Sequence, residues 1–368
     1  MVIAEELTDL EPEISQNIAP IIFDTMGIFW TMKFKNEKEA GLLQEWGLKP
    51  KTLPVEVWVP YGRYGEYANR GIPIDKKFAL KASELTAEDW LLTFDLKMVD
   101  PISILIQKTL GELSKKGDYN LDEILSRLEE EENKIIKDAA ISLFKAAKTW
   151  GIFAEANMPG TKVSELVNPG KTTIIDISTY SSIGSFNVRA LVIGLLSKKL
   201  FNQRLTARKK EELLALQQGA NYLNVKDKRE SPLIWLFIDE AHEFLPQEGK
   251  TAATDPLVQI LREGRQPGIS LVMATQQPGV IHKDAMTQAD IVISHRLTAQ
   301  PDIEALNSIM QSYLLEGIKK SLDDLPSQKG SAIILDDNSE RIYPMRIRPK
   351  FTWHGGEAPS SIRVEGKI

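Results

Sequence analysis

Cysteine is absent from this 368-residue chain, and histidine occurs only four times. Without cysteine the chain has no disulfides, no thiolate zinc site and no cysteine nucleophile. The histidines do not have the spacing of metal ligands; they are His242, His282, His295 and His354. A structural metal site is therefore not expected.

Long apolar runs are also missing. Apolar stretches such as 233–238 (LIWLFI) and 103–106 (SILI) are short, whereas a membrane span requires about 20 residues. The first residues, MVIAEELTDLEPE, carry acids and lack a basic segment followed by an apolar run, so they do not resemble a secretory signal. We therefore expect no membrane segment and a cytoplasmic setting.

A strong basic balance is absent as well. The net charge of −6 argues against a protein whose whole surface binds nucleic acid, although a ring protein needs basic groups only in its channel. With 42% apolar and 26% charged residues, the composition is that of a globular protein. The net charge alone therefore does not decide whether the protein binds nucleic acid.

Short apolar runs alternate with longer amphipathic segments along the chain. This pattern indicates an α/β fold, with a mostly parallel sheet and helices on both faces. The predicted strands are 20–24, 55–60, 172–178, 233–239, 269–275 and 290–295. Residues 330–337 and 341–347 predict a terminal hairpin around Asn338 and Ser339.

Between residues 86 and 150 the pattern is helical only. One helix is expected to open at Asp100 and Pro101, and a later stripe has helical spacing; it consists of Ile135, Ile136, Ala139, Ala140, Leu143, Phe144 and Ala147. We therefore divide the chain into 1–85, the first part of the sheet domain; 86–150, a helical insertion; 151–350, the remainder of the sheet domain; and 351–368, a tail.

Two adjacent carboxylates, Asp239 and Glu240, end the apolar run 233–238. Nucleotide hydrolysis at the carboxyl edge of a parallel sheet uses such a pair: the first acid holds Mg²⁺ through its water shell, and the second orients the attacking water. The alternative is that two acids cap a strand before a helix. Gln276 favours the catalytic hypothesis, because it follows the next predicted strand and would lie beside Asp239 if the two strands are neighbours.

Two arginines, Arg262 and Arg265, end the helix-like segment between these strands, just before the break at Pro267 and Gly268. An arginine at this place either neutralises the end of a helix or acts as an arginine finger on the nucleotide of a neighbouring subunit. The sequence leaves both possibilities open.

Three runs, 238–246 (IDEAHEFLP), 261–278 (LREGRQPGISLVMATQQP) and 289–306 (ADIVISHRLTAQPDIEAL), resemble the HerA branch of the HerA/FtsK superfamily. The run 21–30 (IIFDTMGIFW) is similar to the family's second strand, which places Asp24 near the nucleotide, and 167–178 (VNPGKTTIIDIS) is similar to a later strand. The resemblance implies a RecA-like ATPase that uses ATP and Mg²⁺. It also implies a hexameric ring that translocates double-stranded DNA and works with a nuclease in end processing.

The phosphate-binding P-loop of that family, G-x-x-x-x-G-K-S/T, is not present. Gly-Lys-Thr occurs at 170–172 and 249–251, but the residues five before each glycine are Glu165 and Phe244. A working loop follows a strand and opens a helix, and neither triplet has that context. Residues 2–10, with Ile3, Leu7 and Leu10 on one face, resemble the remainder of the helix that such a loop would open. Met1 is accordingly expected to be an internal or trimmed start.

Two other functions compete with an active motor. The chain is either a motor subunit or a scaffold that forms rings but binds ATP poorly. The run DEAH at 239–242 also matches DEAH-box helicases of superfamily two, although their second-domain motif does not follow. For contacts with DNA phosphates, the densest basic stretch supplies Lys198, Lys199, Arg204, Arg208, Lys209 and Lys210; the alternative is a solvated helix face.

Overall fold

A six-stranded parallel sheet forms the centre of the computed structural model, which describes residues 1–182, 187–218, 229–309, 320–337, 339 and 341–355. Its strand order is β3-β2-β4-β1-β5-β6, and each neighbouring pair is parallel. The bounds are β1 Ile18–Asp24, β2 Val55–Pro60, β3 Lys76–Phe78, β4 Thr172–Asp176, β5 Leu233–Ile238 and β6 Ile269–Met273. The predicted α/β class is confirmed; only the short strand β3 was not predicted.

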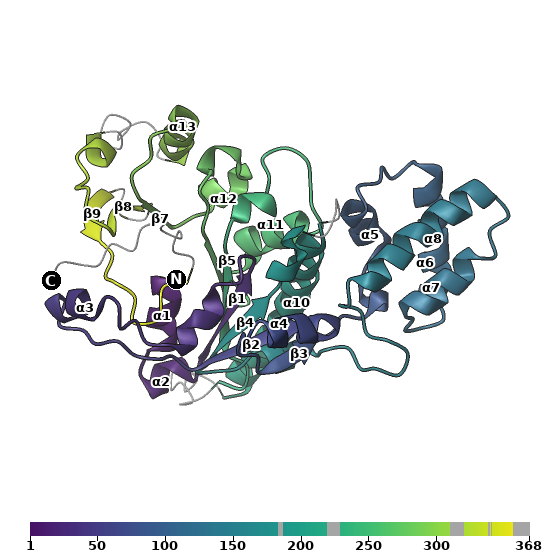
Figure 1. Cartoon of the computed structure of the whole chain (residues 1–368), viewed down its shortest axis with the longest axis horizontal. Helices are drawn as coiled ribbons and strands as arrows, with labels where there is room; N and C mark the ends of the chain where they lie inside the picture. The colour runs from purple at the N-terminus through teal and green to yellow at the C-terminus, as the bar shows by residue number, and fades with distance from the viewer. Residues whose placement is uncertain (183–186, 219–228, 310–319, 338, 340, 356–368) are drawn as a thin grey trace.

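Helices cover both faces of the sheet (Figure 1). Residues of β1 alternate between two apolar cores: Ile21 and Phe23 pack in the core that helix α10 joins, and Ile22 packs with Ala4 of helix α1. The helices around the sheet are α1 Val2–Thr8, α2 Pro12–Ser15, α3 Ala40–Glu45, α4 Tyr64–Asn69, α9 Val163–Leu166, α10 Val188–Gln218, α11 Thr254–Glu263 and α12 Lys283–Thr287. Helix α13 Gln300–Ile309 packs through Leu306 against a second, smaller sheet. Among the described helices none is long and apolar enough to cross a membrane.

The predicted helical insertion consists of four helices that project beyond the sheet (Figure 1). They are α5 Ala87–Thr93, α6 Pro101–Ser114, α7 Leu121–Leu128 and α8 Lys134–Thr149. Capping boxes at Thr86 and Asn120 start α5 and α7, which explains why these helices begin where they do. Trp90 packs against Phe144 and Trp150 in the centre of the bundle. The predicted stripe on α8 is wrong at its start, because Ile135 is 83% exposed.

A second, antiparallel sheet contains β7 Ile291–Ser294, β8 Ser331–Asp336 and β9 Arg341–Arg346 in the order β7-β8-β9. The pairing of β8 with β9 confirms the predicted hairpin; position 338 of its turn lies outside the described residues. Residues 291–294 were expected in the parallel sheet, and they pair with β8 instead. A short apolar run shows that a strand forms but not which strand it pairs with.

The two ends of the described chain meet. Ile3, Leu7 and Leu10 were expected to share one face of helix α1, but Ile3 is 40% exposed and Glu5 is fully buried. The reason is that residues 348–353, expected to begin a tail, cross over α1 on that side. Phe351 and Thr352 are buried there, so the expected tail at 351–368 is wrong for its first residues. A helix packed from two sides does not show a single apolar face.

Candidate functional site

Three aspartates stand at equivalent positions on three neighbouring strands. Asp24 at the end of β1 is in register with Asp176 at the end of β4. Asp239 follows Ile238 of β5, which is in register with Phe23. Because the strands are parallel and ordered β4-β1-β5, their carboxyl ends form one row, Asp176, Asp24, Asp239. We call this the acid row.

Asp24 is fully buried and held by the loop that follows it. Oδ2 accepts the Phe29 amide at 2.8 Å. Oδ1 accepts the backbone amides of Gly27 at 2.7 Å and of Met26 and Ile28 at 3.2 Å. Burial, and then the charge of Asp176, raise the pKa of Asp24 to about 7, although these amides favour its ionised form. Gly27 closes the turn at φ +70°, a conformation that glycine adopts without a steric cost.

Asp176 is also buried, and only one of its oxygens is satisfied. Oδ1 accepts the Ser178 amide at 3.0 Å, the Ser178 hydroxyl at 2.7 Å and the Tyr67 hydroxyl at 2.9 Å. Oδ2 is buried and has no hydrogen-bond partner among the described residues. Burial raises the pKa of Asp176. Ionising Asp176 and Asp24 together is therefore disfavoured, and the pair retains a proton to higher pH than isolated carboxyls do.

The predicted pair Asp239 and Glu240 lies at the other end of the acid row. The Glu240 amide donates to Asp239 Oδ1 at 3.0 Å. Glu240 has left-handed backbone angles, φ 49° and ψ 47°, which are uncommon for a residue other than glycine and concentrate at functional sites. Burial raises the pKa of Asp239, and the charge of Glu240 raises it further.

Gln276 reaches this pair from the next strand, as the sequence predicted. Strands β5 and β6 are neighbours, and the Gln276 side-chain amide donates to Glu240 Oε1. His242 was not predicted; its Nδ1 lies 2.9 Å from the Thr275 hydroxyl and 3.5 Å from Glu240 Oε2. Residues that follow β5 and β6 therefore both contact the Glu240 carboxylate. Its Oε2 atom is buried and has no hydrogen-bond partner in the described part of the chain.

Asp176 was not predicted as a site residue. It lies inside the predicted strand 172–178 and is the last residue of the observed strand β4. Its role depends on Asp24 being its neighbour, and the strand order that makes them neighbours is not written in either segment.

The two arginines differ in their surroundings. The Arg262 guanidinium donates from Nε to Asp284 Oδ2 at 2.7 Å. Arg265 is exposed, and within the described ranges it makes no recorded hydrogen bond or ion pair. Of the two, Arg265 is the one whose charge is not neutralised by a carboxylate of the described residues.

The lysines of both Gly-Lys-Thr triplets face carboxylates of the same chain. Lys171 lies 3.9 Å from Glu56 and precedes β4, so it stands at the opposite edge of the sheet from Asp176. Lys250 donates to Asp255 at 2.9 Å. The Thr251 hydroxyl donates to the Phe244 carbonyl at 2.8 Å. These positions agree with the prediction that neither triplet is a phosphate-binding loop.

The basic stretch on α10 contains one residue that must be removed from the predicted DNA-contacting set. Arg204 is 1% exposed and donates to the carbonyls of Pro267 at 2.8 Å and Ser231 at 3.0 Å. It ties α10 to neighbouring loops. Lys199 and Arg208 form ion pairs with glutamates of this chain, whereas the remaining members are exposed: Lys198, Lys209 and Lys210.

Comparison with known proteins gives sequence matches over part of the chain. Residues 187–300 match the family model described as zonular occludens toxin (Zot). The DNA double-strand break repair helicase HerA of Pyrococcus furiosus is 26% identical over 184 residues, 46% of this chain and 31% of that protein. The "Probable helicase MJ1565" of Methanocaldococcus jannaschii is 32% identical over 102 residues, 28% of this chain and 19% of that protein.

The VirB4 structure of Thermoanaerobacter pseudethanolicus aligns over 94% of this chain and 92% of its own, with 12% identity and a TM-score of 0.48. The sequence matches confirm the resemblance to HerA: the chain is homologous to HerA helicases over about half its length. It spans about a third of the length of those relatives.

The acid row predicts a pH dependence that one substitution should reduce, because burial still raises the pKa of Asp24 when the charge of Asp176 is gone. Because the pKa of Asp24 is raised in the folded state, its contribution to stability is greatest below pH 4 and is lost as the pH rises through 7. Asp176→Asn keeps Oδ1 as an acceptor and removes the charge that raises this pKa. Relative to wild type, the variant should gain on the order of 1 to 3 kcal/mol between pH 5 and 7.5. Urea unfolding at both pH values measures this; an equal pH dependence in both proteins would contradict it.

Proposed function

We propose that this chain carries the metal-holding and water-orienting part of an ATP hydrolysis site, in a DNA-translocating motor related to HerA. The observation that carries the proposal is the placement of Asp239, Glu240 and Gln276 just after the carboxyl ends of the adjacent parallel strands β5 and β6, with Gln276 bonded to Glu240. Homology over about half the chain to a DNA double-strand break repair helicase supports the DNA motor.

Asp239 would hold Mg²⁺ through its water shell. Burial raises its pKa, and a bound cation would restore its ionised form. Glu240 would orient the attacking water with its carboxylate, of which Oε1 already accepts the Gln276 amide. Mg²⁺ would neutralise charge that develops on the phosphates, and Asp24 closes the same edge of the site.

The phosphate-binding element is not supplied by either Gly-Lys-Thr triplet of this chain. Backbone amides at a helix start, together with one lysine, normally offset the charge of a triphosphate. Without them, the carboxylates of the acid row repel it. We therefore propose that the chain as it stands binds ATP weakly.

The proposed assembly of subunits is based on the homology to HerA. We propose a hexameric ring in which Arg265 reaches the nucleotide of the next subunit, while Arg262 stays with Asp284. Exposed lysines of α10, Lys198 among them, would contact the phosphates of double-stranded DNA. A nuclease partner and a cytoplasmic setting stay predictions.

A scaffold function is the second candidate. It is favoured by one observation: both lysines of the Gly-Lys-Thr triplets face carboxylates of their own chain. Such a chain would form rings and hydrolyse nothing.

Titration calorimetry with Mg-ATP tests the predicted weak binding. We expect a dissociation constant weaker than about 1 mM, equivalent to about −4 kcal/mol. Lys171→Met and Lys250→Met should leave the result unchanged. A low-micromolar constant that either substitution abolishes would show that one triplet binds phosphate.

The ring model predicts complementation between inactive subunits. A fusion that supplies a HerA-type glycine-rich loop ahead of residue 1 provides the active reference. Arg265→Ala and Glu240→Gln should each be inactive alone, and mixing them should restore part of the DNA-stimulated ATPase activity, because some interfaces then contain both intact residues. Arg262→Ala is the matched control and should retain activity. If no mixing ratio restores activity, Arg265 does not act across subunits.

A further inference from the structure

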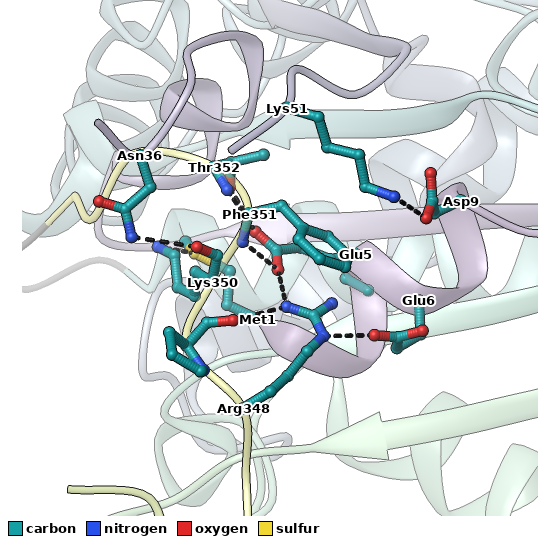
Figure 2. A network of polar contacts seen from close by, with 12 residues as sticks. Met1, Glu5, Glu6, Asp9, Asn36, Lys51, Arg348, Lys350, Phe351 and Thr352 are labelled. Atoms are coloured by element: carbon teal, nitrogen blue, oxygen red, sulfur yellow. Dashed lines mark hydrogen bonds and ion pairs between the residues drawn. The ribbon is translucent and has the colours of Figure 1, made fainter. Parts of the chain in front are cut away.

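The segment that follows β9 returns to the edge of the parallel sheet and crosses helix α1. We call residues 348–353 the strap. Figure 2 shows Arg348, Lys350, Phe351 and Thr352 of the strap gathered around Glu5 of α1. The strap begins beside the small sheet, where the Ile347 amide donates to the Gly330 carbonyl at 2.8 Å. It therefore connects the small sheet to the start of the chain.

Glu5 is the anchor of this contact. Its Oε2 accepts Arg348 Nη1 at 2.8 Å and the Phe351 amide at 3.1 Å. Its Oε1 accepts the Thr352 amide at 3.0 Å and the Thr352 hydroxyl at 2.5 Å. The carboxylate is fully buried. Four donors compensate its desolvation, and all four come from residues more than 340 positions away.

Arg348 makes two further contacts that hold the strap on α1. Its Nε donates to Glu6, and its guanidinium lies 3.6 Å from the centre of the Phe351 ring. Lys51 lies 4.0 Å from the same ring centre and also pairs with Asp9. Two cations therefore lie over the Phe351 ring, and the attraction between a cation and an aromatic ring stabilises both contacts.

The strap also touches the loop that cradles Asp24. The Trp353 amide donates to the Phe34 carbonyl at 2.8 Å, and the Trp353 carbonyl accepts the Thr31 hydroxyl at 3.1 Å. The single proton of this hydroxyl is shared with the carbonyl of Ile28, which lies 2.7 Å from the Thr31 oxygen. Ile28 in turn donates its amide to Asp24. Two hydrogen-bonded residues therefore separate the strap from the acid row on this side.

On the other side, Lys350 of the strap donates to the sulfur of Met1, at the start of α1. The strap therefore contacts the beginning of this helix as well as its first turn at Glu5.

We propose that Glu5 and Arg348 are positioning residues, which fasten the strap to α1 and so link the small sheet to the acid row. A displacement of the small sheet would then be transmitted to both the Asp24 loop and the start of α1. The identification of the sheet edge at the acid row as a nucleotide site rests on the proposed function. The mechanical link between the small sheet and the acid row does not.

The test compares Glu5→Gln with Glu6→Gln, since both glutamates contact Arg348 but only Glu5 is buried. Backbone amide exchange is followed by NMR without nucleotide. In Glu5→Gln, the amides of Gly27 and Phe29, which donate to Asp24, should exchange at least about tenfold faster. The Asp24 titration midpoint should also rise, because these amides favour its ionised form. Glu6→Gln should change neither.

Thr352→Val provides a milder variant if Glu5→Gln does not fold, because it removes only one hydroxyl donor. It should show the same pattern at smaller amplitude. The proposal is overturned if acceleration in the folded variants is confined to α1 and the strap while Gly27, Phe29 and the Asp24 midpoint keep wild-type values. A failure of ATP hydrolysis would leave this measurement unaffected, so the two proposals fail separately.

Discussion

The repulsion among carboxylates at one edge of a parallel sheet is the constraint around which this structure is arranged. Parallel pairing brings Asp176, Asp24 and Asp239 into one row, and burial of Asp176 and Asp24 keeps water from screening these two carboxylates. The structure offsets this in different ways along the row. Backbone amides cradle Asp24, Ser178 and Tyr67 donate to Oδ1 of Asp176, and the Glu240 amide donates to Asp239. A bound cation would complete the compensation at the Asp239 end.

Glu5, away from the acid row, is another buried carboxylate that is compensated by several hydrogen-bond donors, as Asp24 is. A buried carboxylate in α1 is satisfied by donors from the strap, so the position of the helix depends on a segment at the far end of the sequence. Removing one partner of such a buried contact is more costly than its net stabilising contribution suggests, because the other partner remains desolvated. Polar contacts between α1 and the strap thereby tie the small sheet to the large one.

Local patterns in the sequence predicted the elements well, since strand length, apolar runs and the acids after 238 are local properties. Gln276 was also placed correctly, because consecutive strands of a parallel sheet are often neighbours. The misses were long-range. Asp176 acts through a partner on β1, residues 291–294 pair with β8, and Glu5 is buried by a segment that resembled a tail. Each depends on tertiary contacts that no window of the sequence contains.

The central claim is that the acids after β5 perform nucleotide hydrolysis. The most direct measurement is ATP turnover, with DNA, by a fusion carrying a HerA-type phosphate-binding loop, compared with its Glu240→Gln variant. Mg-ATP binding should be retained in the variant, because Asp239 is untouched, while turnover should fall on the order of 100-fold or more. Unchanged turnover in a variant that binds Mg-ATP normally would remove Glu240 from the mechanism and contradict the account.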